Sequence, residues 1–594
     1  LVKFDFLGLK TLTVIDRALK LIRRDGRDVG PEWQSLDDQA TYDLMASGET
    51  LGVFQLEGAG MRDTLKKVRP HNLEDVIAII SLYRPGPMEN IPVYVQGKED
   101  PSSVVYQHPD LKPVLEATYG VPVYQEQVMR MAQEIAGYSL GEADLLRRAM
   151  GKKKVEEMIA QRKRFVEGAA EQKGMEEKLA NDIFDTMEKF AGYGFNKSHA
   201  AAYALIGYHT GYLKRHFPVE FLAASMSLDI GNTDKLAAFF QEAKRLKIPV
   251  LAPDVNTSSA DFDVRDGAVV YALGALKGVG LEAMKHVVEI RDKDGRFADL
   301  YDFAERVDPK HVNKKAFESL SKAGAFDGME PNRARMLESA PLLANLAVSA
   351  AQDRQGGQGG LFAEAEPALR PVLPKTRAWN GQQKLDQEFK SIGFYFSGHP
   401  LDDVLEGLDR ERVTLAMEVQ DRASDGKPLE MIGVVRARSD KPARNGGKFA
   451  FLTLSDPSGE VEMMVFPETL SQNYDLLQVG NAVAITVGVK RNAEEIKLNA
   501  ERVLKLEAAR LSKAMGALKI RLAVGAYVGD LAGVVGHLAK LQDLEQGELL
   551  IEMPLEDGRV VTMKLPATYT IGLSAQRALK EAPGVERVEP LKAA

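Results

Sequence analysis

The segment from Phe190 to Pro218 has the residue types of a site that holds phosphate. A glycine-rich approach leads to Lys197 and Ser198, and a run of strong helix formers begins at His199. We expect Ser198 to be the N-cap of that helix. The free backbone N–H groups of a helix N-terminus and the positive end of its dipole attract anions. The segment therefore predicts a phosphate-binding helix N-terminus.

The same helix carries an imidazole and a phenol on one face. At about 100° per residue, His199, Tyr203, Ile206 and Thr210 lie in line behind the predicted phosphate site. Such a face could meet the sugar and base of a nucleotide. The spacing also suits an ordinary capped helix that packs a His/Tyr stripe into a core, which is the commoner case.

A second cationic region lies between residues 138 and 165. Arg147 and Arg148 project from a predicted helix on the side away from its leucines, and Lys152 begins a run of three lysines. Asp144 is placed i to i+4 from Arg148, so a plain ion pair within the helix is the alternative. If this helix faces the phosphate-binding helix N-terminus, the two form a cleft suited to a triphosphate and its metal ions.

The first residues alternate as in a strand with one apolar face. Lys3 and Asp5 point to the same side of it. A carboxylate beside a lysine could hold a divalent metal next to an anionic substrate, as nucleotidyl transfer requires. A surface salt bridge is the commoner alternative. Because the chain begins with Leu1 inside this pattern, we expect a fragment that opens within a domain.

Length and composition restrict the class of protein. With 594 residues the chain should form several domains, and its net charge of −8 hides local basic regions. It has no cysteine, which excludes disulfides and thiolate metal sites and indicates a reducing cytoplasm. No stretch approaches the roughly 18 apolar residues of a membrane span, so we expect no membrane partner.

Residues 274–292, GALKGVGLEAMKHVVEIRD, have the pattern of a helix-hairpin-helix. The backbone N–H groups of its glycine-containing turn would grip a DNA phosphate without reading sequence. A more degenerate copy follows, and tandem copies carry more information than a single G-x-G. The residues at the two turns are Lys277, Gly278 and Gly280, then Lys322 and Gly324.

Residues 346–375 lose periodicity and are rich in Gln, Gly, Ala and Pro, which predicts a flexible linker. The linker contains QGGLF, which begins at Gln358 and ends with Leu361 and Phe362. Two adjacent large apolar residues in a polar, mobile segment have no core to join. We therefore expect them to dock into a pocket of another protein.

Strands dominate from residue 431 to residue 506, and their five runs fit an OB barrel. Its few aromatic and several basic residues would either guide a single strand or serve only as a scaffold. Residues 508–594 are predicted as a compact α+β module of a strand, a helix, two strands and a final helix. This module has no basic cluster, which favours contact with protein.

Several long segments together resemble the bacterial DNA polymerase III alpha subunit, a C-family replicative polymerase. The resemblance covers nearly the whole chain, and the segments follow the family's order. They are LVKFDFLGL at the start, VFQLEGAGM at 53–61, YRPGP at 83–87, YGVPVYQEQVMRMA at 119–132, LLRRAMGKKK at 145–154 and GYGFNKSHAAAYAL at 192–205.

The resemblance implies an enzyme that transfers a nucleotidyl group from a dNTP to a primer 3′-hydroxyl with two Mg²⁺ ions. Asp5 would be the third catalytic carboxylate and a metal ligand, with Lys3 beside it. The other two carboxylates would precede this sequence, so the chain alone would be inactive. His199 would exclude a ribose 2′-hydroxyl. The residues assigned to the nucleotide are Arg84, Arg147, Arg148, Lys152, Lys197, Ser198, His199 and Tyr203.

The resemblance also implies partners. They are primer-template DNA, dNTP, the sliding clamp (beta) bound through QGGLF, the tau subunit of the clamp loader, and a proofreading exonuclease subunit bound through a missing N-terminal region. Two alternatives stay open. One is the error-prone alpha-like polymerase of lesion bypass, and the other is a non-catalytic scaffold that binds DNA and clamp.

The expected fold is multidomain, with mostly α fingers and a helix-hairpin-helix domain before a β OB barrel and a small α+β module. The expected domains are the edge of the palm at 1–15, fingers at 16–220, a helix-hairpin-helix domain at 221–345, a linker with the clamp motif at 346–390, an OB domain at 391–507 and a tau-binding module at 508–594.

Overall fold

The computed structural model divides the chain into two compact units, residues 1–377 and 378–594, which are described separately. The structure describes residues 8–152, 155–191, 194–355, 370–379, 381–405, 408, 410–443, 447–491, 496–506, 515–522, 528–539, 546–555, 559–580, 582 and 584–592. Within these ranges, no helix is both long and apolar enough to cross a membrane.

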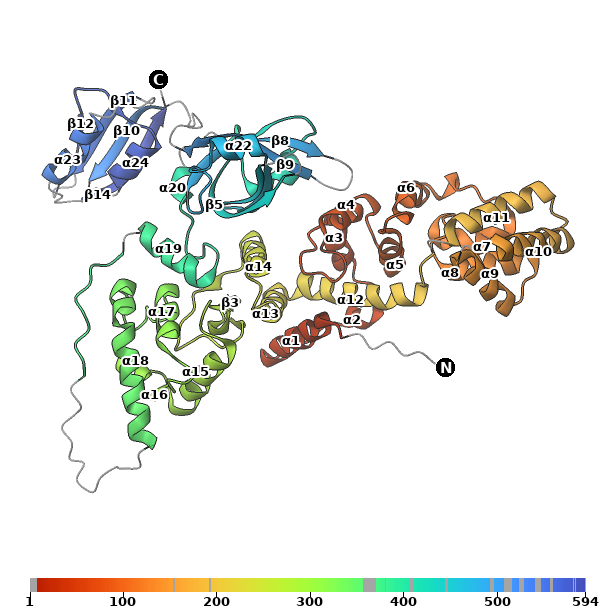
Figure 1. The fold of residues 1–594 in the computed structure, drawn as a ribbon, viewed down its shortest axis with the longest axis horizontal. Helices are drawn as coiled ribbons and strands as arrows, with labels where there is room; N and C mark the ends of the chain where they lie inside the picture. The colour runs from red at the N-terminus through yellow and green to blue at the C-terminus, as the bar shows by residue number, and fades with distance from the viewer. Residues whose placement is uncertain are drawn as a thin grey trace. The chain divides into compact units, whose positions relative to one another are not determined.

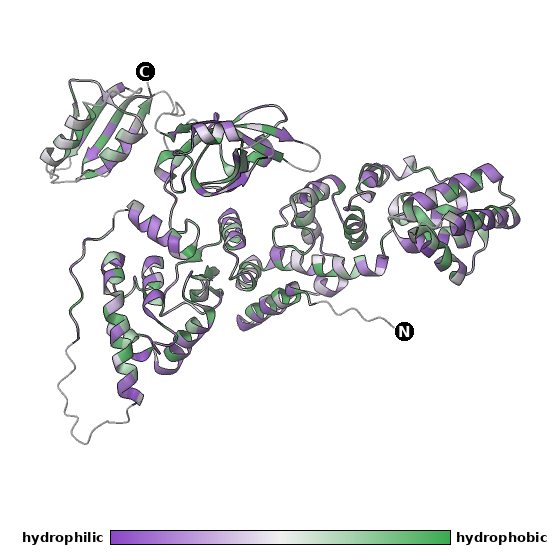
Figure 2. Ribbon diagram, viewed as in Figure 1, coloured by the Kyte–Doolittle hydropathy of each residue, from purple (hydrophilic) through white to green (hydrophobic). Residues whose placement is uncertain are grey.

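The first unit begins with a helical lobe built around one long helix, α12 (Figure 1). Its apolar core contains Tyr42, Val76, Ile79, Tyr94 and Tyr208. The amphipathic helices bury one face each, and Figure 2 shows hydrophilic and hydrophobic residues along the same helices. The elements of this lobe are α1 (Lys10–Arg24), α2 (Glu32–Ser35), α3 (Gln39–Ser47), α4 (Ala59–Val68), α5 (Leu73–Leu82), η1 (Pro87–Asn90), α6 (Ile91–Glu99), η2 (Pro101–Ser103) and α12 (Lys197–His216).

A second helical lobe follows, with a separate core that includes Ile135, Leu146 and Phe165. Phe165 packs on Phe184 with ring centroids 5.5 Å apart, which joins the third and fourth of its long helices. The elements are η3 (Pro109–Leu111), α7 (Lys112–Leu115), η4 (Glu116–Thr118), α8 (Gln125–Ala136), α9 (Leu140–Lys152), α10 (Val155–Lys173) and α11 (Glu177–Ala191).

Helix α12 begins two residues earlier than the sequence predicts. Its N-cap is Asn196, whose side-chain oxygen accepts the backbone N–H of His199 at 2.9 Å. The expected cap, Ser198, lies inside the first turn, so that expectation was wrong. Asparagine caps helices at least as well as serine, and the Asn196 side chain reaches the amide three residues on.

The rest of the first unit is the segment with the helix-hairpin-helix pattern. A small sheet in the order β1-β3-β2 precedes it. The elements are α13 (Pro218–Leu228), α14 (Thr233–Arg245), β1 (Val250–Leu251), β2 (Asp263–Arg265), β3 (Ala268–Val270), η5 (Leu273–Ala275), α15 (Leu281–Asp294), α16 (Leu300–Arg306), α17 (Lys314–Ala323) and α18 (Arg333–Gln355).

Helix α18 corrects the predicted linker. The helix continues to Gln355, so residues 346–355 are helical and not part of a flexible connection. The sequence there, LAVSAAQDRQ, is dominated by good helix formers. Because these residues lack the apolar periodicity of an amphipathic helix, the sequence analysis placed the start of the linker at residue 346 instead of after Gln355.

The second unit contains the expected five-stranded OB-like barrel (Figure 1). Its strands run in the order β5-β6-β7-β9-β8, and β5 pairs with β8 to close it. Met431, Leu452, Val465 and Ile485 are buried in the barrel core. The elements are α19 (Gly381–Ile392), α20 (Asp402–Leu405), β4 (Val413–Thr414), η6 (Ala416–Glu418), α21 (Val419–Arg422), β5 (Leu429–Pro442), β6 (Lys448–Asp456), β7 (Gly459–Val465), α22 (Pro467–Gln472), β8 (Ala482–Arg491) and β9 (Ile496–Lys505).

The last module has a five-stranded sheet, in which four strands run in the order β12-β11-β10-β14 and β13 pairs with β11. The predicted final helix is present, but a strand follows it and pairs antiparallel with β10. The sequence prediction missed that strand because Pro590 and alternating charges obscure its pattern. The elements are β10 (Met515–Leu522), α23 (Val528–Leu538), β11 (Gln546–Pro554), β12 (Val560–Lys564), β13 (Tyr569–Thr570), α24 (Leu573–Lys580) and β14 (Val585–Lys592).

Candidate functional site

A pocket of about 710 Å³ lies between the first helical lobe and the segment α13–α14, beside the N-terminal half of α12. Three of the predicted nucleotide-binding residues, Arg84, His199 and Tyr203, line it. Arg84 lies in the loop between α5 and η1, where Gly86 adopts a φ of +99° that only glycine takes easily. The fold thus brings together residues separated by more than a hundred positions.

The pocket has a wall of aromatic rings in edge-on and tilted contact. The Arg84 guanidinium lies 4.4 Å from the centroid of the Phe195 ring, and that ring is 5.6 Å from the His199 ring. The ring centroid of Tyr203 lies 4.4 Å from that of His199, and the ring centroid of Phe54 lies 5.2 Å from that of Tyr203. The wall offers cationic and aromatic surface side by side, a combination that binds planar and anionic groups.

Arg84 is held in place by its surroundings. Its Nε donates to the carbonyl oxygen of Ser81 at 2.9 Å. Burial lowers the pKa of the Arg84 guanidinium, because a desolvated charge is less favourable. The group stays cationic at neutral pH, since arginine has by far the highest pKa of the basic side chains.

The N-terminus of α12 is occupied by carboxylates of the protein itself. The backbone N–H of Lys197 donates to both oxygens of Glu126, at 3.2 and 3.1 Å. Its side-chain ammonium lies 2.9 Å from the carboxylate of Glu74 and 5.2 Å from the centroid of the Tyr124 ring. A phosphate at this helix end would therefore take the place of carboxylates.

Arg147 and Arg148 both contact Asp144. Arg147 Nη2 is 2.8 Å from Asp144 Oδ1, and Arg148 Nη2 is 2.8 Å from Asp144 Oδ2. The hydrogen bond from Arg147 is the main reason that the pKa of Asp144 is lowered. The intrahelical ion pair expected as the alternative is thus present. Lys152 ends α9, but its side chain lies outside the described part of the structure.

Gln125 connects α9, the helix of Arg147, to Gly194, which lies just before α12. Its side-chain oxygen accepts from Arg147 Nη1 at 3.2 Å, and its side-chain amide donates to the carbonyl of Gly194 at 3.0 Å. The backbone around Phe195 also pairs with the strand-like segment before α8, through the Tyr124–Phe195 bridge. The side chain of Arg147 and the backbone amide of Lys197 thus contact two adjacent residues, Gln125 and Glu126. Arg147, Arg148, Lys197 and Ser198 do not line the pocket that His199 lines.

The comparisons with known proteins agree along the chain. Residues 11–173 match the model of the bacterial DNA polymerase III alpha subunit finger domain, residues 247–336 match a helix-hairpin-helix motif, and residues 430–506 match an OB-fold nucleic acid binding domain. The chain is 50% identical to the DNA polymerase III subunit alpha of Caulobacter vibrioides over 590 residues, which is 99% of this chain and 51% of the relative.

Other relatives give the same result. Identity is 44% over 518 residues with the DNA polymerase III subunit alpha of Thermus aquaticus (85% of this chain, 42% of the relative) and 40% over 534 residues with that of Escherichia coli K12 (87% and 46%). Over most of its length the chain is similar to bacterial DNA polymerase III alpha subunits. It spans about half the length of these relatives.

The finger match includes Arg84, Arg147 and Arg148 and ends before Lys197 and His199. The sequence analysis missed Gln125, Glu126 and Glu74, as well as the rings of Phe54 and Phe195. The available signal was the polar pair Gln125-Glu126 at the start of a predicted helix, inside a segment already noticed for its resemblance. Glu74 had no such signal because only the fold brings it to Lys197.

The first helix-hairpin-helix turn has free backbone donors. Gly278 and Gly280 have φ angles of +87° and +84°. Among the described residues, the N–H groups of Gly278 and Gly280 donate no backbone hydrogen bond. A Cβ at Gly278 would lie 2.9 Å from Lys315 Cε, whereas a Cβ at Gly280 would meet nothing within 4 Å. Lys277 precedes these amides in the turn.

The second predicted turn differs from the first. Gly324 is the left-handed C-cap of α17, and its N–H donates to the carbonyl of Ser321 at 3.2 Å. The next amide, that of Ala325, donates to Leu320 at 2.9 Å, and the guanidinium of Arg333 covers Gly324. Lys322 lies on the helix, 4.0 Å from Glu318. These amides are used within the turn, so the geometry favours the first turn for binding phosphate.

The predicted metal and clamp residues lie outside the described part of the chain. They are Lys3, Asp5, Gln358, Leu361 and Phe362. Within the described part, no group of three or more histidine, aspartate or glutamate residues could hold a metal ion.

Proposed function

We propose that this chain serves template-directed DNA synthesis, in which a nucleotidyl group passes from a dNTP to the 3′-hydroxyl of a primer. The observation that supports this most is the pocket lined by Arg84, His199 and Tyr203, in a chain whose relatives are named DNA polymerase III subunit alpha. Its size suits a nucleotide-sized ligand, because small-molecule sites usually enclose about 300 to 1,000 Å³.

The chain's own residues would bind and orient the nucleotide. The ring wall of Phe195, His199 and Tyr203 would face the sugar and base, and the imidazole would crowd a 2′-hydroxyl. Arg84, Lys197 and Arg147 would carry the positive charge for the triphosphate. Charge-assisted hydrogen bonds of this kind are roughly twice as strong as neutral ones, so they are suited to positioning an anionic substrate.

Carboxylates of the protein itself contact two of these cations. Glu74 pairs with the Lys197 ammonium, and Asp144 pairs with Arg147. Exchange of a carboxylate for a phosphate keeps each cation paired in both states.

Mg²⁺ is the cofactor that we propose for the reaction, in which it would neutralise the phosphate charge. The described residues do not fit this role, because they contain no cluster able to hold a metal. Asp5 lies outside them. We therefore derive no step of the reaction through the metal ions.

The remaining parts would hold DNA and partner proteins. We propose that the free amides of Gly278 and Gly280 bind a phosphate of duplex DNA, and that the OB barrel contacts a single strand. Residues Gln358, Leu361 and Phe362 would bind the sliding clamp, and the C-terminal module would bind the tau subunit. The proofreading exonuclease subunit would bind outside this chain, and the assembly would act in the cytoplasm.

Primer extension by the full-length protein tests the proposal. We expect primer extension that requires every dNTP matched to the template. Arg84→Ala should lower the dNTP kcat/KM by well over tenfold, because roughly 1.5 to 3 kcal/mol is lost with a charged hydrogen bond. Full extension by an Asp5→Ala protein would reject the catalytic role of Asp5. Duplex and clamp binding without extension by the unaltered protein would favour a scaffold.

A further inference from the structure

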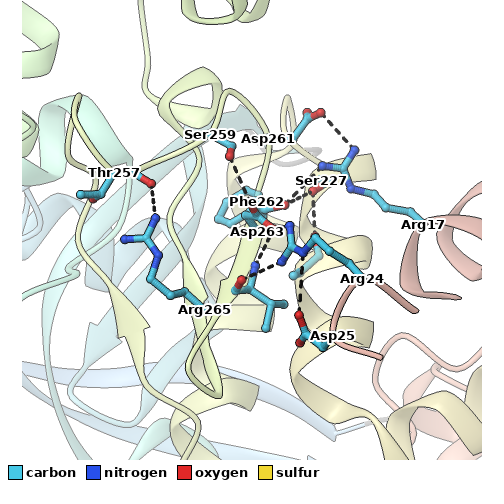
Figure 3. A network of polar contacts seen from close by, with 12 residues as sticks. Arg17, Arg24, Asp25, Ser227, Thr257, Ser259, Asp261, Phe262, Asp263 and Arg265 are labelled. Carbon is cyan, nitrogen blue, oxygen red and sulfur yellow. Dashed lines mark hydrogen bonds and ion pairs between the residues drawn. The ribbon is translucent and has the colours of Figure 1, made fainter. Parts of the chain in front are cut away.

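Two arginines on one face of α1 clasp the small sheet that precedes the first helix-hairpin-helix turn (Figure 3). Arg17 Nη1 lies 3.0 Å from Asp261 Oδ2, and Arg17 Nη2 donates to the carbonyl of Phe262 at 3.2 Å. Arg24 repeats the arrangement one residue pair further on, with Nη1 2.6 Å from Asp263 Oδ1 and Nη2 2.8 Å from the carbonyl of Val264.

The repeat fits the geometry of the two elements. Seven residues separate the arginines, which is about 10.5 Å along a helix and nearly two full turns, so both point the same way. Their partners are four consecutive residues, 261–264, which offer a carboxylate, a carbonyl, a carboxylate and a carbonyl in turn. An extended chain rises about 3.3 Å per residue, so these partners are spread along the helix axis. A guanidinium can bind a carboxylate and a carbonyl at once because its donors form a rigid planar fork, which lysine lacks.

The clasped segment is connected directly to the DNA-facing turn. The amide of Leu273 donates to the carbonyl of Ser259 at 3.0 Å, and the amide of Gly274 donates to Ala260 at 2.9 Å. Ser259 and Ala260 are the two residues before Asp261. The contact leaves no room for a side chain, because a Cβ at Gly274 would lie 2.7 Å from the Ala260 oxygen. Three residues after Gly274 the turn Lys277–Gly280 begins.

The other side of the clasp leads to the pocket. Lys10 and Val14, on the same helix as the arginines, line the pocket with Arg84 and His199. Ile15, Ala18 and Ile22 anchor that helix in an apolar cluster with α12 and α13. A continuous set of hydrogen bonds and packed residues therefore runs from the nucleotide pocket through α1 to the turn.

We propose that Arg17 and Arg24 are positioning residues, which hold the duplex-binding turn at a fixed distance and angle from the nucleotide pocket. The inference rests on the proposed function in DNA synthesis. When one DNA molecule binds the pocket, a rigid connection keeps the turn close to that DNA, so the turn binds it at a high effective concentration. A looser connection lowers this effective concentration and therefore the affinity for DNA that reaches both sites. Neither arginine needs to touch DNA.

Two variants disrupt the clasp from opposite sides. Arg17→Gln with Arg24→Gln removes the fork donors, and Asp261→Asn with Asp263→Asn removes their carboxylate partners. Arg23→Gln is the matched control, because Arg23 lies on the same helix and forms an ion pair with the exposed Asp28, at 3.4 Å. Arg17→Lys with Arg24→Lys keeps the charge and loses the fork.

The measurement is the affinity of full-length protein for fluorescent primer-templates of two lengths, one confined to the pocket and one long enough to reach the turn. For the unaltered protein and Arg23→Gln we expect the longer duplex to bind tighter. In both double variants this gain falls by about tenfold or more, while affinity for the short DNA and the dNTP KM stay within about twofold. The double lysine variant should lose the gain as well.

Comparison of the arginine-side and aspartate-side variants distinguishes a positioning role of Arg17 and Arg24 from direct contact of these arginines with DNA. If the arginines bind DNA themselves, the arginine variant weakens binding but the asparagine variant, which removes two negative charges, strengthens it. That result, or an unchanged length dependence in both variants, would overturn the inference. Absence of primer extension by the unaltered protein would instead count against the proposed function, and the length dependence would still report on the clasp.

Discussion

The ammonium group of Lys197 lies 2.9 Å from the carboxylate of Glu74, which comes from the first turn of α5. The lysine is about one-third exposed and the glutamate about half, so the pair is accessible to solvent and to ligands. Exposed pairs of this kind contribute little to stability, about 0 to 1 kcal/mol. Glu74 therefore holds the lysine in place at low cost until a more highly charged anion arrives.

The pair predicts opposite effects for its two members. Lys197→Ala should raise the dNTP KM or lower turnover by well over tenfold, because a charge-assisted phosphate contact of about 1.5 to 3 kcal/mol is lost. Glu74→Gln removes only the competitor, so we expect an equal or lower dNTP KM. Steady-state kinetics with the full-length protein measures both, and equal losses in the two variants would show that the pair is merely structural.

Arg147 and Arg148 should not be equivalent. Arg147 is mostly covered and also donates to Gln125, whereas Arg148 is largely exposed and contacts Asp144. We expect Arg147→Ala to lower dNTP kcat/KM by more than tenfold, because it removes a cation and loosens the Gln125 link to the approach of α12. Arg148→Ala should have a smaller effect. The reverse order in single-nucleotide incorporation would contradict this reading.

The buried pair of Lys214 and Glu242 predicts a large loss of stability. Lys214 Nζ lies 2.6 Å from Glu242 Oε1, and Arg245 binds the same carboxylate through two nitrogens. Glu242→Gln leaves the buried lysine without its counter-charge and should cost about 3 to 5 kcal/mol. Glu49→Gln, at the exposed end of the same network, should cost less than about 1 kcal/mol. Thermal unfolding of the two variants gives the comparison.

The same pair gives a pH dependence. Burial alone would raise the pKa of Glu242, but the hydrogen bonds from Arg245 and the charge of Lys214 outweigh it, so the pKa lies below the usual 4.5. A carboxyl with a lowered pKa in the folded state stabilises the protein above its unfolded pKa, and this contribution is lost as the pH falls below about 4.5. The Glu242→Gln protein should show a weaker loss of stability over that range, and an identical acid profile would contradict the assignment.

Two glycines with similar φ angles but different ψ angles, Gly280 (ψ 136°) and Gly324 (ψ 16°), should separate DNA binding from stability. Gly280→Ala and Gly324→Ala each place a side chain at a φ above +80° and should cost about 1 to 3 kcal/mol of stability, with the larger cost at Gly280, whose ψ lies outside the left-handed helical region. Gly324→Ala also meets the Arg333 guanidinium. Only Gly280→Ala should weaken duplex binding, without changing sequence preference, because its turn has the free amides. Equal DNA affinities in binding assays would remove the phosphate role of the first turn.

The QGGLF motif gives a further prediction. Leu361→Ala with Phe362→Ala should abolish binding of the sliding clamp to the full-length protein, because the two apolar side chains are the anchors of a short linear motif. Primer extension without clamp should not change. Pull-down or biosensor binding to purified clamp measures the loss, and unaltered binding would show that the motif is not used.

Local patterns in the sequence were sufficient to predict most of the helices and strands, although not β14. The amphipathic helices of the finger segment, the glycine turn at residues 277–280 and the alternating strands of the barrel each follow from periodicity and turn residues within one short window. The long segments that resemble the alpha subunit identified the family. The boundary errors at Ser198 and at residues 346–355 are also local, since asparagine and serine cap helices equally well and a helix needs no apolar stripe to continue.

Tertiary structure decided which of these residues meet. Nothing in the sequence near Lys197 indicates Glu74 or Glu126, and nothing near Arg17 indicates Asp261, because each pair is brought together by the packing of separate helices around shared apolar cores. Charge type and helical spacing are properties of a segment, whereas the partner of a charge depends on which segments pack together. The sequence determined the chemical groups of this protein, and the fold determined their partners.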